Sequence, residues 1–183
     1  MKELVIKYKS VIKFILTFLL VYISLSVVYK FYLDASKDSV YYPDYITNLV
    51  AVQSADLIDI LGYDVQVVPH PDEPSMKLII NDVYLARIVE GCNSISVIIL
   101  FVSFILAFSG KPKPTFLFIL SGSVIIYVVN LVRIAVLSIG IYHYPEKSEI
   151  LHTVVFPGII YGIVFLLWIV WVNRFSSMIK KNE

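Results

Sequence analysis

The chain has 183 residues, of which 58% are hydrophobic and 14% aromatic, and its formal net charge is +1. This composition is too apolar for a soluble domain of that length and indicates an integral membrane protein. The small net charge and the absence of one basic stripe argue against nucleic acid as a partner, and the single cysteine excludes an intramolecular disulfide.

Four apolar runs divide the chain. The first, Val11 to Tyr29, has about the length that a helix needs to cross a bilayer, and Lys13 within it can snorkel to the interface. The other three are 95–108, which is short, 115–142 and 153–172. We therefore predict an all-α integral membrane protein with about four transmembrane helices and a small α+β extracytoplasmic insert.

The insert is predicted to hold one amphipathic helix and a hairpin. Apolar residues recur at helical spacing from Ile46 to Leu61, with Pro43-Asp44 as a start signal and Gly62 as a stop signal. Residues 65–68 and 76–80 are strand-like, and Asn81-Asp82 is typical of a tight turn leading into the run that starts at Val83. The second strand of this hairpin would lead directly to the segment that contains Cys92.

Basic residues indicate the orientation of the spans. The N-terminus, the Lys111/Lys113 turn and the tail from Arg174 are basic, whereas the insert and the loop around His143 are acidic or nearly balanced. By the positive-inside rule, both termini are cytoplasmic in a multi-pass protein of the inner (cytoplasmic) membrane, and the insert faces outward. The predicted units are 1–29 (N-terminus and first span), 30–91 (extracytoplasmic insert), 92–173 (three-helix transmembrane catalytic core) and 174–183 (basic cytoplasmic tail).

Cys92 lies where the polar insert meets the second apolar run. A lone cysteine beside an apolar helix is more often a packing residue than a nucleophile. Its polar flanks, which include Glu90 and Asn93, favour the nucleophile, as does a place at a helix N-terminus, where the backbone dipole stabilises a thiolate. Both interpretations remain open from the residues alone, and Glu90 and Asn93 are the expected supporting residues.

Arg133 and His152 are the residues expected to assist Cys92. An arginine within a span costs at least ~2.5 kcal/mol on insertion scales, so it normally faces a partner or a wet cavity. Asn130, one turn earlier, is placed to orient the guanidinium or to bond to another helix. His152 heads the last span at the outward face, where an imidazole would take and return a proton.

Two competing histidines, His70 in the proline-rich loop and His143 at the far end of its loop, rank lower as proton carriers. A thiol, an imidazole and a guanidinium on one membrane face suggest thiol-based acyl transfer. No cluster of cysteine, histidine and carboxylate residues has a metal-binding spacing, so neither a metal nor an organic cofactor is expected.

The order of these residues resembles the exosortase/archaeosortase family, especially its small F-type members. The likeness covers 83–172 and is most specific at Asn130-Leu-Val-Arg133. It implies a membrane-embedded cysteine transpeptidase that cuts the carboxy-terminal sorting signal (short motif, hydrophobic helix, basic tail) from exported proteins and passes the new terminus to an envelope acceptor. It also implies that Cys92 is the nucleophile, Arg133 the partner of the transition state or thiolate, and His152 the acid/base.

Two departures from the family pattern accompany the resemblance. Many members have cysteine-serine-glycine where this chain has Cys92-Asn93-Ser94, and many have eight spans, so a minimal core is implied. The expected partners are exported substrates, membrane lipid and an associated membrane protein. The acidic insert is placed to bind either the extracytoplasmic motif of the substrate or the associated protein.

The alternative function is a non-enzymatic scaffold or assembly subunit of an export or envelope complex. Cys92 would then be packed, and Arg133 would be paired with a carboxylate such as Glu90. A small transporter is a third interpretation, but the chain lacks the inverted repeat that would favour it.

Overall fold

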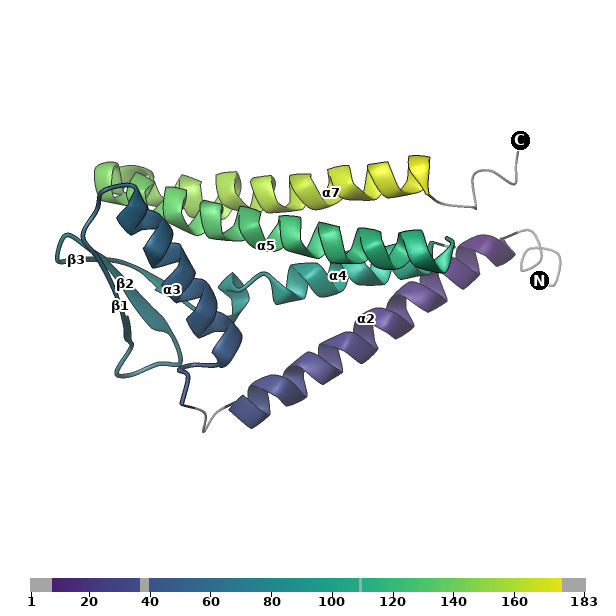
Figure 1. Cartoon of the computed structure of the whole chain (residues 1–183), viewed down its shortest axis with the longest axis horizontal. Helices are drawn as coiled ribbons and strands as arrows, with labels where there is room; N and C mark the ends of the chain where they lie inside the picture. The colour runs from purple at the N-terminus through teal and green to yellow at the C-terminus, as the bar shows by residue number, and fades with distance from the viewer. Residues whose placement is uncertain (1–7, 37–39, 109, 176–183) are drawn as a thin grey trace.

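The computed structural model describes residues 8–36, 40–108 and 110–175. Three long helices, α2 (Lys9–Ser36), α5 (Pro112–His143) and α7 (Phe156–Arg174), and the shorter α4 (Ile95–Ala107) make up the bundle, with α2 oblique to the others (Figure 1). Helices α2 and α5 run towards a small α/β unit, and α4 and α7 run away from it (Figure 1). We call this end of the bundle the sheet end.

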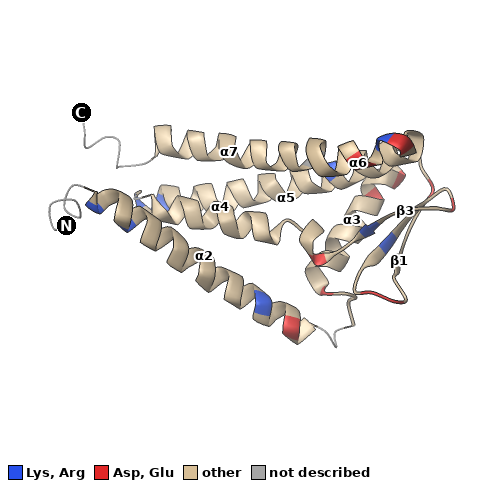
Figure 2. Cartoon of the chain, turned by 180° about the vertical axis from the view of Figure 1, so that it is seen from behind, with Lys and Arg blue, Asp and Glu red and all other residues tan. Residues whose placement is uncertain are grey.

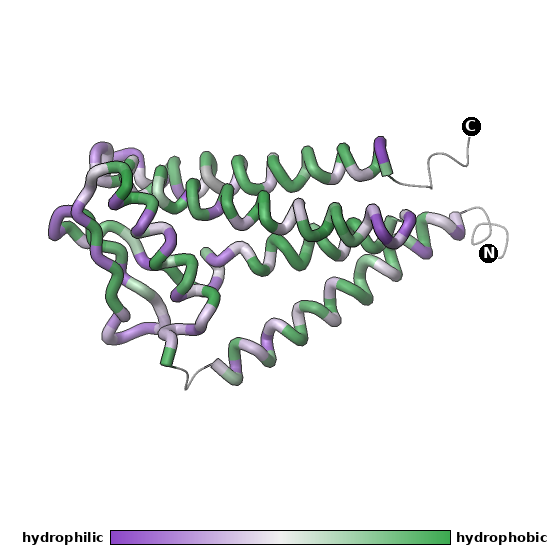
Figure 3. Tube along the Cα trace, in the orientation of Figure 1, coloured by the Kyte–Doolittle hydropathy of each residue, from purple (hydrophilic) through white to green (hydrophobic). Residues whose placement is uncertain are grey.

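Three helical stretches among the described residues are long and apolar enough to cross a membrane: Lys9–Ser36, Pro112–His143 and Pro145–Arg174. Apolar residues run along α4 as well (Figure 3). However, α4 has only 13 residues, a length of about 20 Å, whereas a span normally needs about 20 residues. The membrane class is thus confirmed, and the prediction of four spans stays a prediction.

Helix α2 ends seven residues later than the first apolar run. The apolar run stops at Tyr29, but the helix continues to Ser36. Its last turns therefore enter the segment expected to be the insert. Basic residues mark the starts of α2 and α5, while acidic residues gather around the α/β unit (Figure 2).

The α/β unit has the elements that the sequence predicts. Helix α3 (Tyr45–Ile60) is capped by Asp44, whose Oδ1 accepts the N–H groups of Ile46 and Thr47, each at 3.0 Å. Asn81 and Asp82 have positive φ values of 47° and 63°, as a two-residue hairpin turn requires. The unit's three strands form an antiparallel sheet in the order β1 (Val65–Pro69), β2 (Met76–Ile80), β3 (Val83–Ile88).

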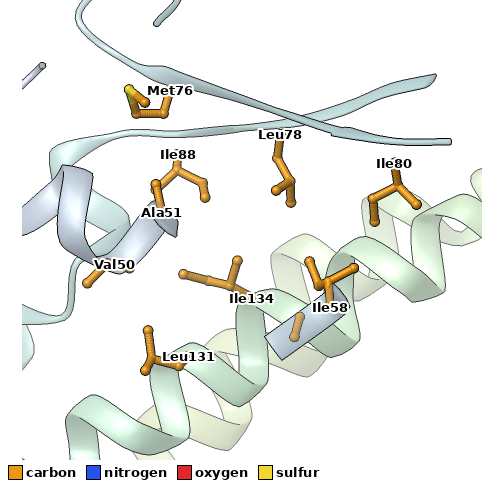
Figure 4. Close-up of a cluster of buried hydrophobic side chains, with 10 residues drawn as sticks. Val50, Ala51, Ile58, Met76, Leu78, Ile80, Ile88, Leu131 and Ile134 are labelled. Atoms are coloured by element: carbon orange, nitrogen blue, oxygen red, sulfur yellow. The ribbon is translucent and has the colours of Figure 1, made fainter. Parts of the chain in front are cut away.

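The sheet packs against α3 and α5, so the α/β unit shares one core with the bundle (Figure 4). Every second residue of β2 is buried, which places one face of the sheet against the helices. The facing side chains come from α3 and from the second half of α5: Val50, Ala51, Ile58, Leu131, Ile134 and Ala135. The α/β unit therefore packs on the second half of α5.

A second core joins α4, α5 and α7 away from the sheet end. Phe101 and Ile105 of α4 are buried there with Ile126 of α5 and with Val164 and Trp171 of α7. The backbone of α5 comes close to α4 at Gly122, since a Cβ built there would lie 2.3 Å from Cζ of Phe101. A small residue at this point lets the two helices approach.

We predict that Gly122→Ala destabilises the bundle, because the added methyl group must displace the buried Phe101 ring. Overpacking of this kind costs roughly 1–3 kcal/mol, and thermal unfolding in detergent would measure it. Gly162→Ala is the matched control, since a Cβ on Gly162 meets nothing within 4 Å. Equal melting temperatures for the two variants would contradict the close contact between α4 and α5.

Candidate functional site

Cys92 ends a single 3-10 turn, η1 (Glu90–Cys92), that follows β3. Its N–H donates to the carbonyl of Val89 at 2.8 Å. Helix α4 begins only at Ile95, and Ser94 before it has a left-handed backbone with φ +65°. The predicted start of this helix at Ile95 is thus confirmed, and Cys92 lies two residues before the N-cap, on a separate turn.

The side chain of Asn93 is completely buried and ties this segment to three helices. Its Nδ2 donates to the hydroxyl of Tyr29 on α2 at 2.8 Å and to that of Thr47 on α3 at 3.0 Å. Its Oδ1 accepts the N–H of Ile95, the first residue of α4, at 3.0 Å. Asn93 thus supports the site by fixing the backbone next to Cys92.

Asn130 on α5 is also completely buried and connects Cys92 to Arg133. Its Nδ2 donates to the main-chain carbonyl of Cys92 at 2.7 Å, and its Oδ1 accepts from Nη1 of Arg133 at 3.3 Å. The contact with Arg133 agrees with the expected orienting role. The bond to the Cys92 backbone was not predicted.

The guanidinium of Arg133 is largely unpartnered. Its Nε is buried without a hydrogen-bond partner. Among the residues that the structure describes, no carboxylate forms an ion pair with Arg133. The pairing with Glu90 that the scaffold alternative would use is therefore not formed, and Arg133 retains donors for a bound group.

Cys92, Arg133 and His152 line a single cavity of about 500 Å³, which we call the Cys92 cavity. Its walls are β3, the second half of α5 and the β1–β2 loop. The three side chains come from η1, α5 and the segment before α7, so the fold brings together residues up to 60 positions apart. Cys92 is partly exposed, as access to a cavity requires.

His152 is exposed and lies on a π-helical turn, η3 (Leu151–Val155). The helical stretch around it starts earlier, with a 3-10 turn at Pro145–Lys147 and a short helix at Ser148–Ile150. His152 is therefore inside a helical stretch and does not head it, which corrects the sequence interpretation. Pro157 has no N–H to donate to the preceding turn, which accounts for the irregular backbone there.

A cluster of three charged or titratable side chains, His70, Glu73 and Arg87, also lines the Cys92 cavity. Nη1 of Arg87 donates to Oε2 of Glu73 at 2.7 Å, and Nε2 of His70 is 3.7 Å from Oε1 of Glu73. The hydrogen bond from Arg87 lowers the pKa of Glu73, and the same bond raises the pKa of Arg87. The sequence analysis ranked His70 low and did not identify Glu73 or Arg87. The register of the predicted hairpin could have indicated them, because it pairs Arg87 with Lys77, close to the β1–β2 loop that carries His70 and Glu73.

Both ring nitrogens of His70 have close neighbours in the structure. Its Nδ1 already accepts the backbone N–H of Asp72 at 3.2 Å. In the neutral ring the other nitrogen, Nε2, then carries the hydrogen and faces Glu73. His152 has no such contact among the described residues, so the geometry favours His152 as the proton carrier.

Glu90 and His143 lie outside the Cys92 cavity. Glu90 is exposed and lines a second cavity of about 700 Å³, here the Glu90 cavity, which shares only Glu73 and Arg87 with the first. His143 is hydrogen-bonded through Nε2 to the hydroxyl of Tyr63 at 2.8 Å. Neither side chain is placed to assist Cys92 directly.

A thiol, an imidazole and a guanidinium with unused donors line one cavity, and these are the groups that thiol-based acyl transfer uses. Within 8–36, 40–108 and 110–175, no group of three or more histidine, cysteine or acidic residues could hold a metal ion.

The chain matches a known family of membrane proteins. The model of the family described as transmembrane exosortase matches residues 7–172. No curated protein and no solved structure matches the chain.

We predict that Ser94→Gly raises the stability of the protein. A left-handed backbone costs a non-glycine residue roughly 1–2 kcal/mol, and the buried Oγ of Ser94 has no hydrogen-bond partner. Thermal unfolding in detergent would measure the gain. The control is Ser96→Gly, two residues later in the first turn of α4, where glycine lowers helix stability. A loss of stability in both variants would contradict the left-handed conformation of Ser94.

Proposed function

The chain belongs to the transmembrane exosortase family, and from that membership we propose that it is a membrane-embedded cysteine protease/transpeptidase. It cleaves the carboxy-terminal sorting signals of exported proteins and transfers the new terminus to an envelope acceptor. The observation that carries the proposal is the single cavity lined by Cys92, Arg133 and His152.

In the first half-reaction, His152 takes the proton of the Cys92 thiol, and the sulfur attacks the carbonyl carbon of the scissile amide. A carbon–sulfur bond forms, and the carbonyl oxygen takes the negative charge. When the carbon–nitrogen bond breaks, His152 gives a proton to the departing amine. The substrate's new carboxy-terminal residue is then held as a thioester on Cys92.

Arg133 stabilises the negative charge that develops in this step. Its buried Nε has no partner, and the oriented guanidinium is held by Asn130. A fixed donor in a site shielded from water stabilises an oxyanion more strongly than a solvated one does. Asn130 also donates to the main-chain carbonyl of Cys92, so one side chain positions both the proposed nucleophile and the guanidinium of Arg133.

In the second half-reaction, an acceptor amine, or water, attacks the thioester carbon. His152 takes the proton of the attacking group, and the thiolate of Cys92 leaves and regains a proton from His152. The balance needs no metal, oxidant or reductant, because each step exchanges one acyl bond for another.

The proposed setting is the inner (cytoplasmic) membrane, with both termini cytoplasmic and the Cys92 cavity facing outward. The distribution of charge supports this orientation, since the starts of α2 and α5 are basic and the sheet end is acidic (Figure 2). Exported proteins would meet the Cys92 cavity on the outward face of the membrane. The α/β unit is the part of the chain available to an associated membrane protein there.

We predict that Cys92→Ala abolishes processing of a tagged exported protein whose carboxy terminus is an apolar helix with a basic tail. The thioester cannot form without the sulfur. The measurement is the size shift of the tagged protein in cells that accumulate equal amounts of either enzyme. A size shift that persists with Cys92→Ala would refute the transpeptidase.

The three histidines give an internal comparison for the acid/base. His152→Gln should slow processing by roughly 10²–10⁴-fold, whereas His143→Gln should not, because His143 is bonded to Tyr63 outside the cavity. His70→Gln should also leave the rate nearly unchanged. A large loss with His70→Gln and none with His152→Gln would transfer the acid/base role to His70.

A further inference from the structure

Strand β3 is an edge strand. It pairs with β2 on one side only, because the sheet order is β1-β2-β3. Outside that ladder, no backbone hydrogen bond of the described residues uses an N–H or C=O group of Val83–Ile88. Every second residue of β3 therefore presents a donor and an acceptor away from the sheet, the arrangement to which a further strand can pair.

This edge strand borders the Cys92 cavity along nearly its whole length. All five residues from Tyr84 to Ile88 line the cavity, and Cys92 follows four residues after the strand ends. The opposite wall is α5, which contributes Arg133. An extended chain of five residues on β3 would cover about 17 Å and lead to the thiol.

The other edge of the sheet lacks these features. Strand β1 contributes no residue to the Cys92 cavity. On β3, Leu85 is skipped in the register, because Ala86 pairs with Leu78 and Tyr84 pairs with the adjoining Ile79. Such a bulge bends an edge strand and discourages unselective pairing, and bulges are common beside active sites.

We propose that the substrate polypeptide binds by adding a strand to the free edge of β3, so that its scissile bond is carried along the Cys92 cavity to Cys92. The inference rests on the proposed function for the identity of the substrate. Main-chain hydrogen bonds supply affinity in this mode, and the cavity receives alternate side chains. The ligand class is an extended segment of an exported protein, lying next to the bond that is cut.

Disulfide mapping tests this geometry, and the chain is suited to it because Cys92 is its only cysteine. Cys92→Ala gives a cysteine-free protein, into which Tyr84→Cys or Ala86→Cys places one thiol on β3. The probe is the tagged exported protein, with single cysteines moved along the segment before its apolar helix. We expect disulfides with both β3 positions, and the preferred substrate position should shift by about two residues between them, as for paired strands.

Val68→Cys on β1, whose native side chain is 38% exposed, is the matched control. Equal or stronger cross-linking from Val68→Cys, no cross-linking from β3, or a shift of three to four residues would overturn strand addition. Processing by the native enzyme is scored separately in the same cells. Cys92-dependent processing without β3 cross-links would reject strand addition alone, whereas Cys92-independent processing would reject the proposed function.

Discussion

The side chain of Asn130 is the contact on which the rest of the site depends. Its two ends hold the main-chain carbonyl of Cys92 and the guanidinium of Arg133. Because the amide is completely buried, losing either partner would leave a polar group unsatisfied at a cost of roughly 1–3 kcal/mol. The turn after β3 is therefore fixed at one position along α5. The α/β unit packs against the same helix, which contributes to its core.

Local signals predicted most of the fold. Asp44 and Gly62 bound α3, and Asn81-Asp82 turns β2 into β3, because capping and left-handed turns depend on a few adjacent residues. The late end of α2 and the π-helical turn at His152 were not predicted. Hydropathy marks where a membrane run stops but not where its helix stops, and a π-helical turn has no periodic signature.

The candidate residues Cys92 and Arg133 could be identified from the sequence, but the contacts between them could not. Arg133 attracts notice because a charge within an apolar run is costly, and Cys92 because it is the only thiol. The contact between Asn130 and the Cys92 carbonyl joins residues 38 positions apart, and the entry of His70 into the cavity depends on strand register. The structure also bears on the family departure at Ser94, since glycine, which many exosortases have there, adopts the observed φ of +65° freely.

The length of α5 relates the position of Arg133 to the thickness of a bilayer. Arg133 lies about 31 Å along this helix from Pro112, at about 1.5 Å per residue. The hydrocarbon layer of a bilayer is about 30 Å thick. With Pro112 at one boundary of that layer, the guanidinium of Arg133 would lie at the opposite boundary. The Cys92 backbone, bonded to Asn130 one turn earlier on the same helix, would then lie near the border between water and lipid.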